Sequence, residues 1–183
     1  MIRHVRRKLL GWCTVSIAVA FAAAHGTAGA KANVRHVKAP VAFHVTLANT
    51  EYKRSEPIEA TLSLENKGKR AVWVNTRFYV NSDTLPPEER EVLLEVTSPT
   101  GEKLPCTYSQ QTGFPKSEYF KLLKPGQTAT AEQPRGLRNY FDFAALGRYT
   151  VVGIYTNVFG QEIGLDALTG PVRSKPVTFT IVE

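Results

Sequence analysis

Short runs of alternating apolar and polar residues fill the chain from residue 41 onward. In the first run, Val41, Phe43, Val45 and Leu47 alternate with small or polar residues. Because side chains on a β-strand point alternately to opposite faces, a period of two predicts strands with one buried face. No amphipathic run at helical spacing reaches eleven residues in this part of the chain. The pattern therefore predicts an all-β domain and argues against a parallel sheet, which needs crossover helices.

The alternation predicts seven to eight antiparallel strands. We expect them over 41–48, 57–65, 70–78, 91–97, 120–123, 128–132, 149–155 and 177–181. Gly- and Pro-containing turns separate them, and the run 104–116 is expected to be a long loop. The strand over 149–155 is apolar on both faces, as a central strand would be. Many short strands at this spacing indicate a β-sandwich or barrel.

Residues 1–30 have the three parts of a signal peptide. A basic start with Arg6, Arg7 and Lys8 precedes an apolar stretch, and Ala28-Gly29-Ala30 supplies a small-residue cleavage site. The stretch is short for a spanning helix, although an uncleaved anchor is the alternative. We therefore expect an exported protein, periplasmic or secreted, with a flexible lead-in over 31–40 and one domain over 41–183.

Removing the predicted leader changes the charge and cysteine arguments. The leader carries four basic residues and no acidic ones, so 19 basic and 16 acidic residues remain. This near balance does not predict a nucleic-acid-binding or membrane-binding surface. Only Cys106 remains, so the domain can form no intrachain disulfide. Its thiol is expected to be buried or, in the alternative, to pair between chains.

Gly147 and Tyr149 open the strongest predicted strand. In immunoglobulin-like domains, a tyrosine near the start of the corresponding strand forms a corner, with its hydroxyl bonded to backbone upstream. This position therefore favours an immunoglobulin-like β-sandwich over a barrel. The alternative is that Tyr149 is an ordinary strand tyrosine.

A wider pattern resembles a known group of domains. The pattern runs through Phe120, Leu123-Lys124-Pro125-Gly126, Tyr140, Phe143, Gly147 and Tyr149. It resembles secreted bacterial immunoglobulin-like domains, including the non-catalytic β-domain that precedes deuterolysin-type metallopeptidases. The opening Glu56-Pro57-Ile58 and the Gly147 corner are also similar to BsuPI-type proteinase-inhibitor domains. The resemblance implies a fold more than a function, and the chain has no H-E-x-x-H motif.

No set of catalytic or metal-binding residues stands out. His36 and His44 lack a neighbouring ligand at metal-site spacing. Cys106 and His44 would need a third orienting group to act as nucleophile and base. The acidic residues Glu88, Glu89 and Glu91 are expected to form a solvated loop. We therefore predict no enzymatic activity, no cofactor and no metal.

Four residues are candidates for partner contact: Trp73, Arg77, Tyr108 and Phe114. If Val72 and Val74 face the core, Trp73 and Arg77 face outward; in the opposite phase Trp73 is a core residue, which is preferred because exposing Trp is costly. Tyr108 and Phe114 either pack down the long loop or form a recognition surface.

The predicted function is an exported, non-enzymatic binding module. It would contact a protein or surface polymer through loops or a sheet edge. The alternative is a proteinase inhibitor of the BsuPI-like type, with the loop 103–116 in the protease cleft.

Overall fold

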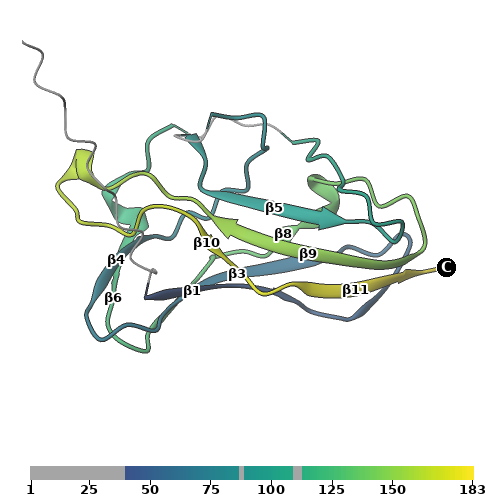
Figure 1. Cartoon of the computed structure of the whole chain (residues 1–183), viewed down its shortest axis with the longest axis horizontal. Helices are drawn as coiled ribbons and strands as arrows, with labels where there is room; N and C mark the ends of the chain where they lie inside the picture. Colours follow the sequence, from purple (N-terminus) through teal and green to yellow (C-terminus); the bar gives the residue numbers. More distant parts are fainter. Residues whose placement is uncertain (1–39, 87–88, 109–112) are drawn as a thin grey trace, which may run out of the picture. The chain divides into compact units, whose positions relative to one another are not determined.

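The computed structural model describes residues 40–86, 89–108 and 113–183. These ranges contain eleven strand segments and short 3₁₀ helices, and no α-helix (Figure 1). The predicted all-β class is therefore confirmed. No helix within them is long and apolar enough to cross a membrane. The predicted signal peptide and nearly all of the lead-in lie outside the described residues.

The first sheet is built around β3 (Glu59–Asn66). β1 (Val41–Leu47) pairs antiparallel with β3 along its whole length. β7 (Thr128–Thr130) and the short β8 (Arg135–Gly136) pair with β3 as well. The alternation that predicted β1 and β3 reflects this arrangement, because every second side chain of each strand is buried.

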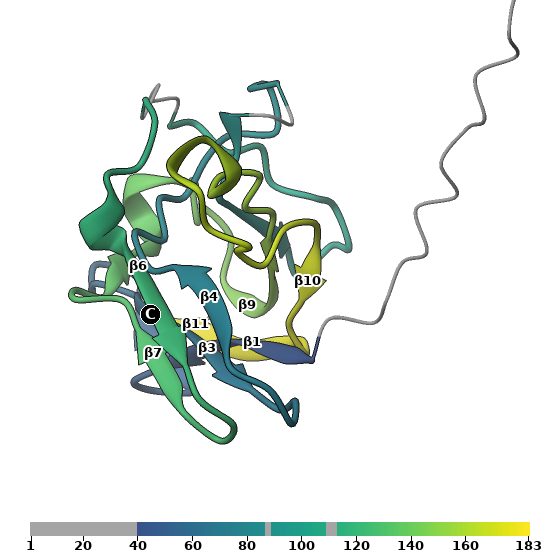
Figure 2. The ribbon, with the colours of Figure 1, turned by 90° about the vertical axis from the view of Figure 1, so that its left-hand side faces the viewer.

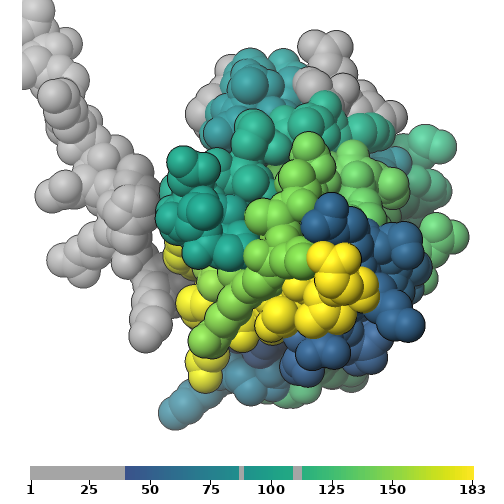
Figure 3. All heavy atoms as spheres, turned by 90° about the vertical axis from the view of Figure 1, so that its right-hand side faces the viewer, coloured from purple at the N-terminus to yellow at the C-terminus, as the bar shows by residue number. Residues whose placement is uncertain are grey.

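The second sheet is built around β9 (Gly147–Tyr155). β5 (Val92–Thr97) pairs antiparallel with one edge of β9. β10 (Val172–Arg173) and β11 (Val177–Val182) pair antiparallel with the other edge, one after the other along its length. β2 (Glu51–Lys53) adds to β11 in parallel, so that β11 lies between β9 and β2 (Figure 3). The prediction that β9 is a central strand is confirmed.

A two-stranded ribbon forms a third unit. β4 (Val72–Asn75) pairs antiparallel with β6 (Phe120–Leu123), and the two lie side by side in Figure 2. Asn66, at the end of β3, connects the ribbon to the first sheet: its side-chain amide donates to the carbonyl oxygens of Leu123 and Arg70, both at 2.8 Å.

The two main sheets pack their apolar faces together, as in a β-sandwich. They approach closely at Gly153 on β9, where an added Cβ would lie 2.6 Å from Val45 and 2.7 Å from Phe43. Only glycine fits at this contact between β9 and β1. Aromatic rings fill the rest of the interior, including the stacked pair Tyr149 and Phe179, with ring centroids 5.4 Å apart.

The chain turns sharply as it enters β9. Gly147 has a φ of 120°, which residues other than glycine rarely adopt. Two residues later the Tyr149 hydroxyl donates to the carbonyl oxygen of Ala145 at 2.7 Å. This is the backbone contact that a tyrosine corner requires.

The structure differs from the predicted strand pattern in two respects. Three strands, β2, β8 and β10, have only two or three residues each. An alternation of apolar and polar residues cannot be recognised in so short a sequence. In addition, the strand predicted over 70–78 ends at Asn75. Beyond it Phe78 adopts a positive φ of 49°, which is incompatible with strand geometry. Asn75 and Arg77, which were expected to face outward, are buried.

Candidate binding site

Arg77 lies buried near the start of the segment between β4 and β5. Its Nε donates to Oε1 of Glu91 at 2.7 Å, its Nη2 also contacts that oxygen, and Nη2 donates to the carbonyl oxygen of Gly113 at 2.9 Å. Both partners are almost inaccessible, with side-chain exposures of 5% for Arg77 and 0% for Glu91. Two sequence predictions are corrected here: Arg77 is buried and does not face outward, and Glu91 does not belong to a solvated acidic loop.

The backbone around this ion pair is held by side-chain hydrogen bonds. Asn75 Oδ1 accepts from the amide of Arg77 at 3.0 Å, and Asn81 Oδ1 accepts from the amide of Glu91 at 2.7 Å. The second carboxylate oxygen of Glu91 accepts from the amide of Tyr79 at 3.2 Å. A buried carboxylate needs such donors, because an unpaired charge in the interior is costly.

Two tyrosine rings flank the Arg77 guanidinium. Its central carbon lies 4.7 Å from the ring centroid of Tyr79 and 5.9 Å from that of Tyr119, within the range of cation–π attraction. Tyr119 ends the 3₁₀ helix Ser117–Tyr119, and its carbonyl oxygen accepts from the Thr76 hydroxyl at 2.8 Å. We call Arg77, Glu91, Tyr79 and Tyr119 the Arg77 hub.

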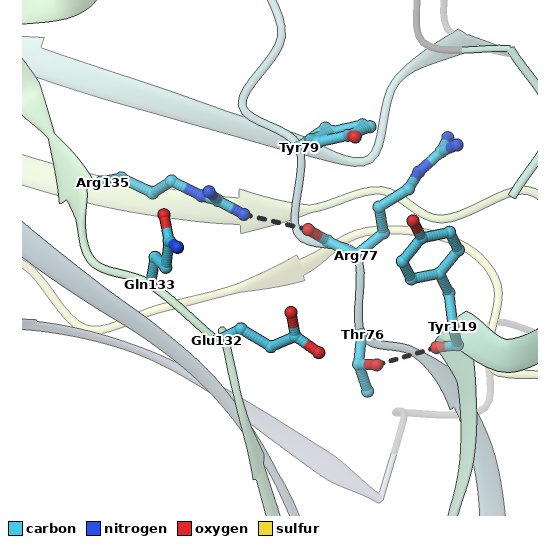
Figure 4. A pocket seen from close by; sticks show the side chains of 7 residues that line it. All are labelled: Thr76, Arg77, Tyr79, Tyr119, Glu132, Gln133 and Arg135. Carbon is cyan, nitrogen blue, oxygen red and sulfur yellow. Dashed lines mark hydrogen bonds between the residues drawn. The ribbon is translucent and has the colours of Figure 1, made fainter.

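A polar pocket of about 180 Å³ opens beside the hub. It is lined by Thr76, Arg77, Tyr79, Tyr119, Glu132, Gln133 and Arg135 (Figure 4), and we call it the hub pocket. The segment between β7 and β8 supplies Glu132 and Gln133, and β8 supplies Arg135.

Arg135 uses little of its hydrogen-bonding capacity. Its Nη2 donates to the carbonyl oxygen of Arg77 at 3.0 Å, as Figure 4 shows, and no carboxylate of the described ranges lies within 4.0 Å of it. Its Nε is buried and has no partner within that part of the chain. Glu132 lies across the same pocket with an exposed side chain.

The other predicted contact residues lie in different surroundings. Trp73 is half-buried, because the segment after β9 crosses the ribbon beside it: the amide of Leu168 donates to the Trp73 carbonyl oxygen at 2.8 Å. Tyr108 is 36% exposed and its ring meets Tyr140 edge-on at 5.2 Å. Phe114 is 77% exposed, more than any other large apolar residue of the described ranges.

Phe114 is nevertheless held in place. Its ring meets the buried ring of Phe159 edge-on, with centroids 5.6 Å apart. The residue before it is Gly113, whose carbonyl oxygen is bonded to Arg77. Phe114 therefore stands on backbone that the Arg77 hub fixes. The structure brings Arg77 and Phe114 together in this way.

Cys106 lines a second, smaller pocket of about 100 Å³ together with residues of β5. The thiol is free and half-buried, and Sγ donates to the carbonyl oxygen of Tyr108 at 3.5 Å. Burial raises the pKa of the Cys106 thiol, which disfavours the reactive thiolate. His44 contacts Glu65 at 3.3 Å instead. Within the described residues, no three His, Cys, Asp or Glu side chains are grouped to hold a metal.

Comparison with known proteins gives little further information. No protein-family model and no curated protein sequence matches the chain. Among solved structures, a partial likeness is found to AvmM, which catalyses macrocyclization in alchivemycin A biosynthesis. The identity is 12%, the TM-score is 0.36, and the match covers 79% of this chain and 90% of AvmM.

AvmM is an enzyme, so this comparison lends no support to the expectation that the chain has no enzymatic activity. At this TM-score the likeness carries no argument about fold, substrate or reaction.

Sequence reasoning missed most of the pocket. Tyr79, Glu132, Gln133 and Arg135 come from three separate segments that strand pairing brings together. Arg77 and Glu91 were noticed individually, but fourteen positions separate them and no local pattern links them. The single usable signal was that Arg77 and Glu91 flank the same connection between two predicted strands.

Proposed function

We propose that this chain is an exported, immunoglobulin-like binding module that contacts a protein or a surface polymer through the loops around the Arg77 hub. Export is supported by the basic, apolar and small-residue parts of residues 1–30. The immunoglobulin-like assignment is supported by β1, β3 and β7 in one sheet and β5, β9 and β11 in the other, and by the Tyr149 corner.

The exposed ring of Phe114 carries the proposal. Aromatic side chains that dominate binding energy are large and lose few rotamers on burial. Phe114 already has its ring against Phe159, and its backbone is next to the Gly113 carbonyl that Arg77 fixes. A partner that covers this ring would gain apolar burial at a small cost in ordering. The loop that follows β9 lies at the same end, which faces the viewer in Figure 2.

A capture experiment tests this function. The processed domain, residues 31–183, is immobilised and exposed to an extract of its native cell envelope, and the same is done with Phe114→Ser and Leu146→Ser variants. Leu146 is a matched control, since it is also a large exposed apolar residue (36%) and it precedes β9, at the opposite end of that strand from the loop beside Phe114. We expect wild type and Leu146→Ser to retain the same specific partner and Phe114→Ser to lose it. Equal capture by all three proteins, or none by the wild type, would refute the proposal.

The proteinase-inhibitor alternative rests on the same ring. Phe114 belongs to the segment 103–116 that was expected to enter a protease cleft, and its exposure suits a residue that fills a specificity pocket. Assays against a broad panel of serine, cysteine and metallo-proteinases separate the two functions. Inhibition that Phe114→Ser abolishes would favour the inhibitor, and no inhibition across the panel would remove it.

A further inference from the structure

The lining of the hub pocket is polar throughout. All seven side chains around it carry a hydroxyl, amide, carboxylate or guanidinium group. Sites for lipids and other apolar ligands are lined mostly by hydrophobic side chains. A ligand without hydrogen-bonding groups would leave these polar groups dehydrated and unpaired, at a cost for each of them. The pocket is therefore built for a polar ligand.

The pocket carries almost no net charge. Glu91 neutralises Arg77 behind the pocket wall. The remaining charges, Arg135 and Glu132, have opposite signs. A polyanion would be repelled by Glu132 and a cation by Arg135. The balance favours a neutral ligand.

The side chains that line the hub pocket include hydrogen-bond donors and acceptors that have no partner within the described part of the chain. Arg135 makes one hydrogen bond, and Glu132 and Gln133 make none through their side chains. The hydroxyl groups of Tyr79 and Tyr119 are likewise without a hydrogen-bonding partner among those residues. A hydroxyl group is both donor and acceptor, so it can satisfy a carboxylate and a guanidinium at once. Adjacent hydroxyls on one ring would pair with the two planar groups, each through two bonds.

We infer that the hub pocket binds one ring of a neutral saccharide, either free or as a unit of a surface polysaccharide. This deepens the proposed function, on which it rests, by choosing the surface polymer as the partner at this site. Glu132 and Gln133 accept from and donate to ring hydroxyls, Arg135 donates to a second pair, and the tyrosine hydroxyls close the opposite side. The volume of about 180 Å³ is below that of sites for drug-sized ligands, which suits a single ring.

Nuclear magnetic resonance titration of the processed domain tests the inference. The probes are methyl glucoside, maltotriose and chitotriose as neutral saccharides, with trigalacturonate as an acidic one and glycylglycine as a zwitterion. We expect a neutral saccharide to shift the side-chain signals of Gln133 and Arg135. Glu132→Gln keeps an exposed polar side chain and so preserves folding, yet it should weaken binding by about tenfold or more, since hydrogen bonds to a charged carboxylate are stronger than those to a neutral amide.

Two controls make the result specific. Leu146→Ser should bind as wild type does. A free monosaccharide and its polymer are distinguished by whether the monosaccharide alone shifts the pocket signals. Three results would overturn the inference. The first is binding of trigalacturonate or glycylglycine but of no neutral sugar. The second is the absence of shifts in the pocket signals with every probe, and the third is an unchanged affinity in Glu132→Gln. Failure here with Phe114-dependent capture intact would leave the proposed function standing. Saccharide binding in the hub pocket without Phe114-dependent capture would support the inference and refute the proposed function.

Discussion

Replacing Arg77 by Met is expected to destabilise the domain more than loss of any exposed charge. The substitution keeps a long apolar stem and removes the guanidinium. Within the described residues, the Glu91 carboxylate would then keep a single donor, the amide of Tyr79 at 3.2 Å. Since the Glu91 side chain is 0% exposed, water cannot replace the lost partner.

The expected loss can be worked from this burial. Removing one member of a buried ion pair typically costs about 3–5 kcal/mol in the free energy of unfolding. For a domain of this size, each kcal/mol lowers Tm by roughly 2–4 °C, so the fall should be about 6–20 °C. An Arg77→Met, Glu91→Leu double variant should recover most of it, because no uncompensated charge then remains inside.

Urea and thermal unfolding of the processed domain, followed by circular dichroism, measure these values. The matched control is Arg173→Met, which breaks an ion pair of the same chemistry between Arg173 and Glu95 at side-chain exposures of 55% and 30%. That change should cost less than about 1 kcal/mol. Equal losses for the two single variants, or a double variant no more stable than Arg77→Met, would refute the reasoning.

Three further predictions concern other parts of the fold. Tyr149→Phe removes the hydroxyl bond to Ala145 and should cost about 1 kcal/mol in urea unfolding; a variant as stable as wild type would show that the corner does not stabilise the fold. The hydrogen bond from Arg173, with a smaller effect of Lys103, lowers the pKa of Glu95. This ion pair therefore stabilises the fold above the ordinary carboxyl pKa, and its contribution is lost as pH falls through the lowered pKa. In Arg173→Met the titration midpoint of Glu95, measured by nuclear magnetic resonance, should rise, and an unmoved midpoint would contradict this cause. Burial raises the pKa of Cys106, so at pH 8 iodoacetamide should alkylate the folded protein more slowly than the urea-unfolded chain, and equal rates would exclude a shielded thiol.

The strands that the sequence predicted well have one face toward the core. In β1, β3 and β5 every second residue is buried, so the period of two in the sequence survives in the fold. β9 was recognised for a different reason: Val151, Val152 and Gly153 are buried in succession, so apolar residues follow one another there and do not alternate with polar ones.

The same reasoning failed for the segment after β4. There the face expected to be exposed is covered by the loop that follows β9: Asn157, itself buried, accepts from the side-chain amide of Asn75 at 3.1 Å. Polar residues on that face are therefore buried among hydrogen-bonding partners, and polarity no longer indicates exposure. The positive φ of Phe78 also changes the direction of the backbone, and the conformational preference of phenylalanine does not predict this.

The candidate site was only partly predictable. Phe114 was named from composition, as an aromatic residue in an irregular loop, and its high exposure agrees with a recognition surface more than with packing. Arg135 and Glu132 gave no signal, because their importance comes from facing Arg77 across a pocket formed by distant segments. Long-range strand pairing is information that period and spacing do not contain.

The parallel pairing of β2 with β11 has a mechanical consequence. Thr180 donates to Thr50 at 2.9 Å and Arg54 donates to Val182 at 3.0 Å, with the β2–β11 ladder between them. Traction applied upstream of β2 and downstream of β11 would slide these strands along their length, so their bonds would have to rupture together and not one after another. A tether that pulled from the start of β2 and from the end of β11 would therefore meet the resistance of the whole ladder at once.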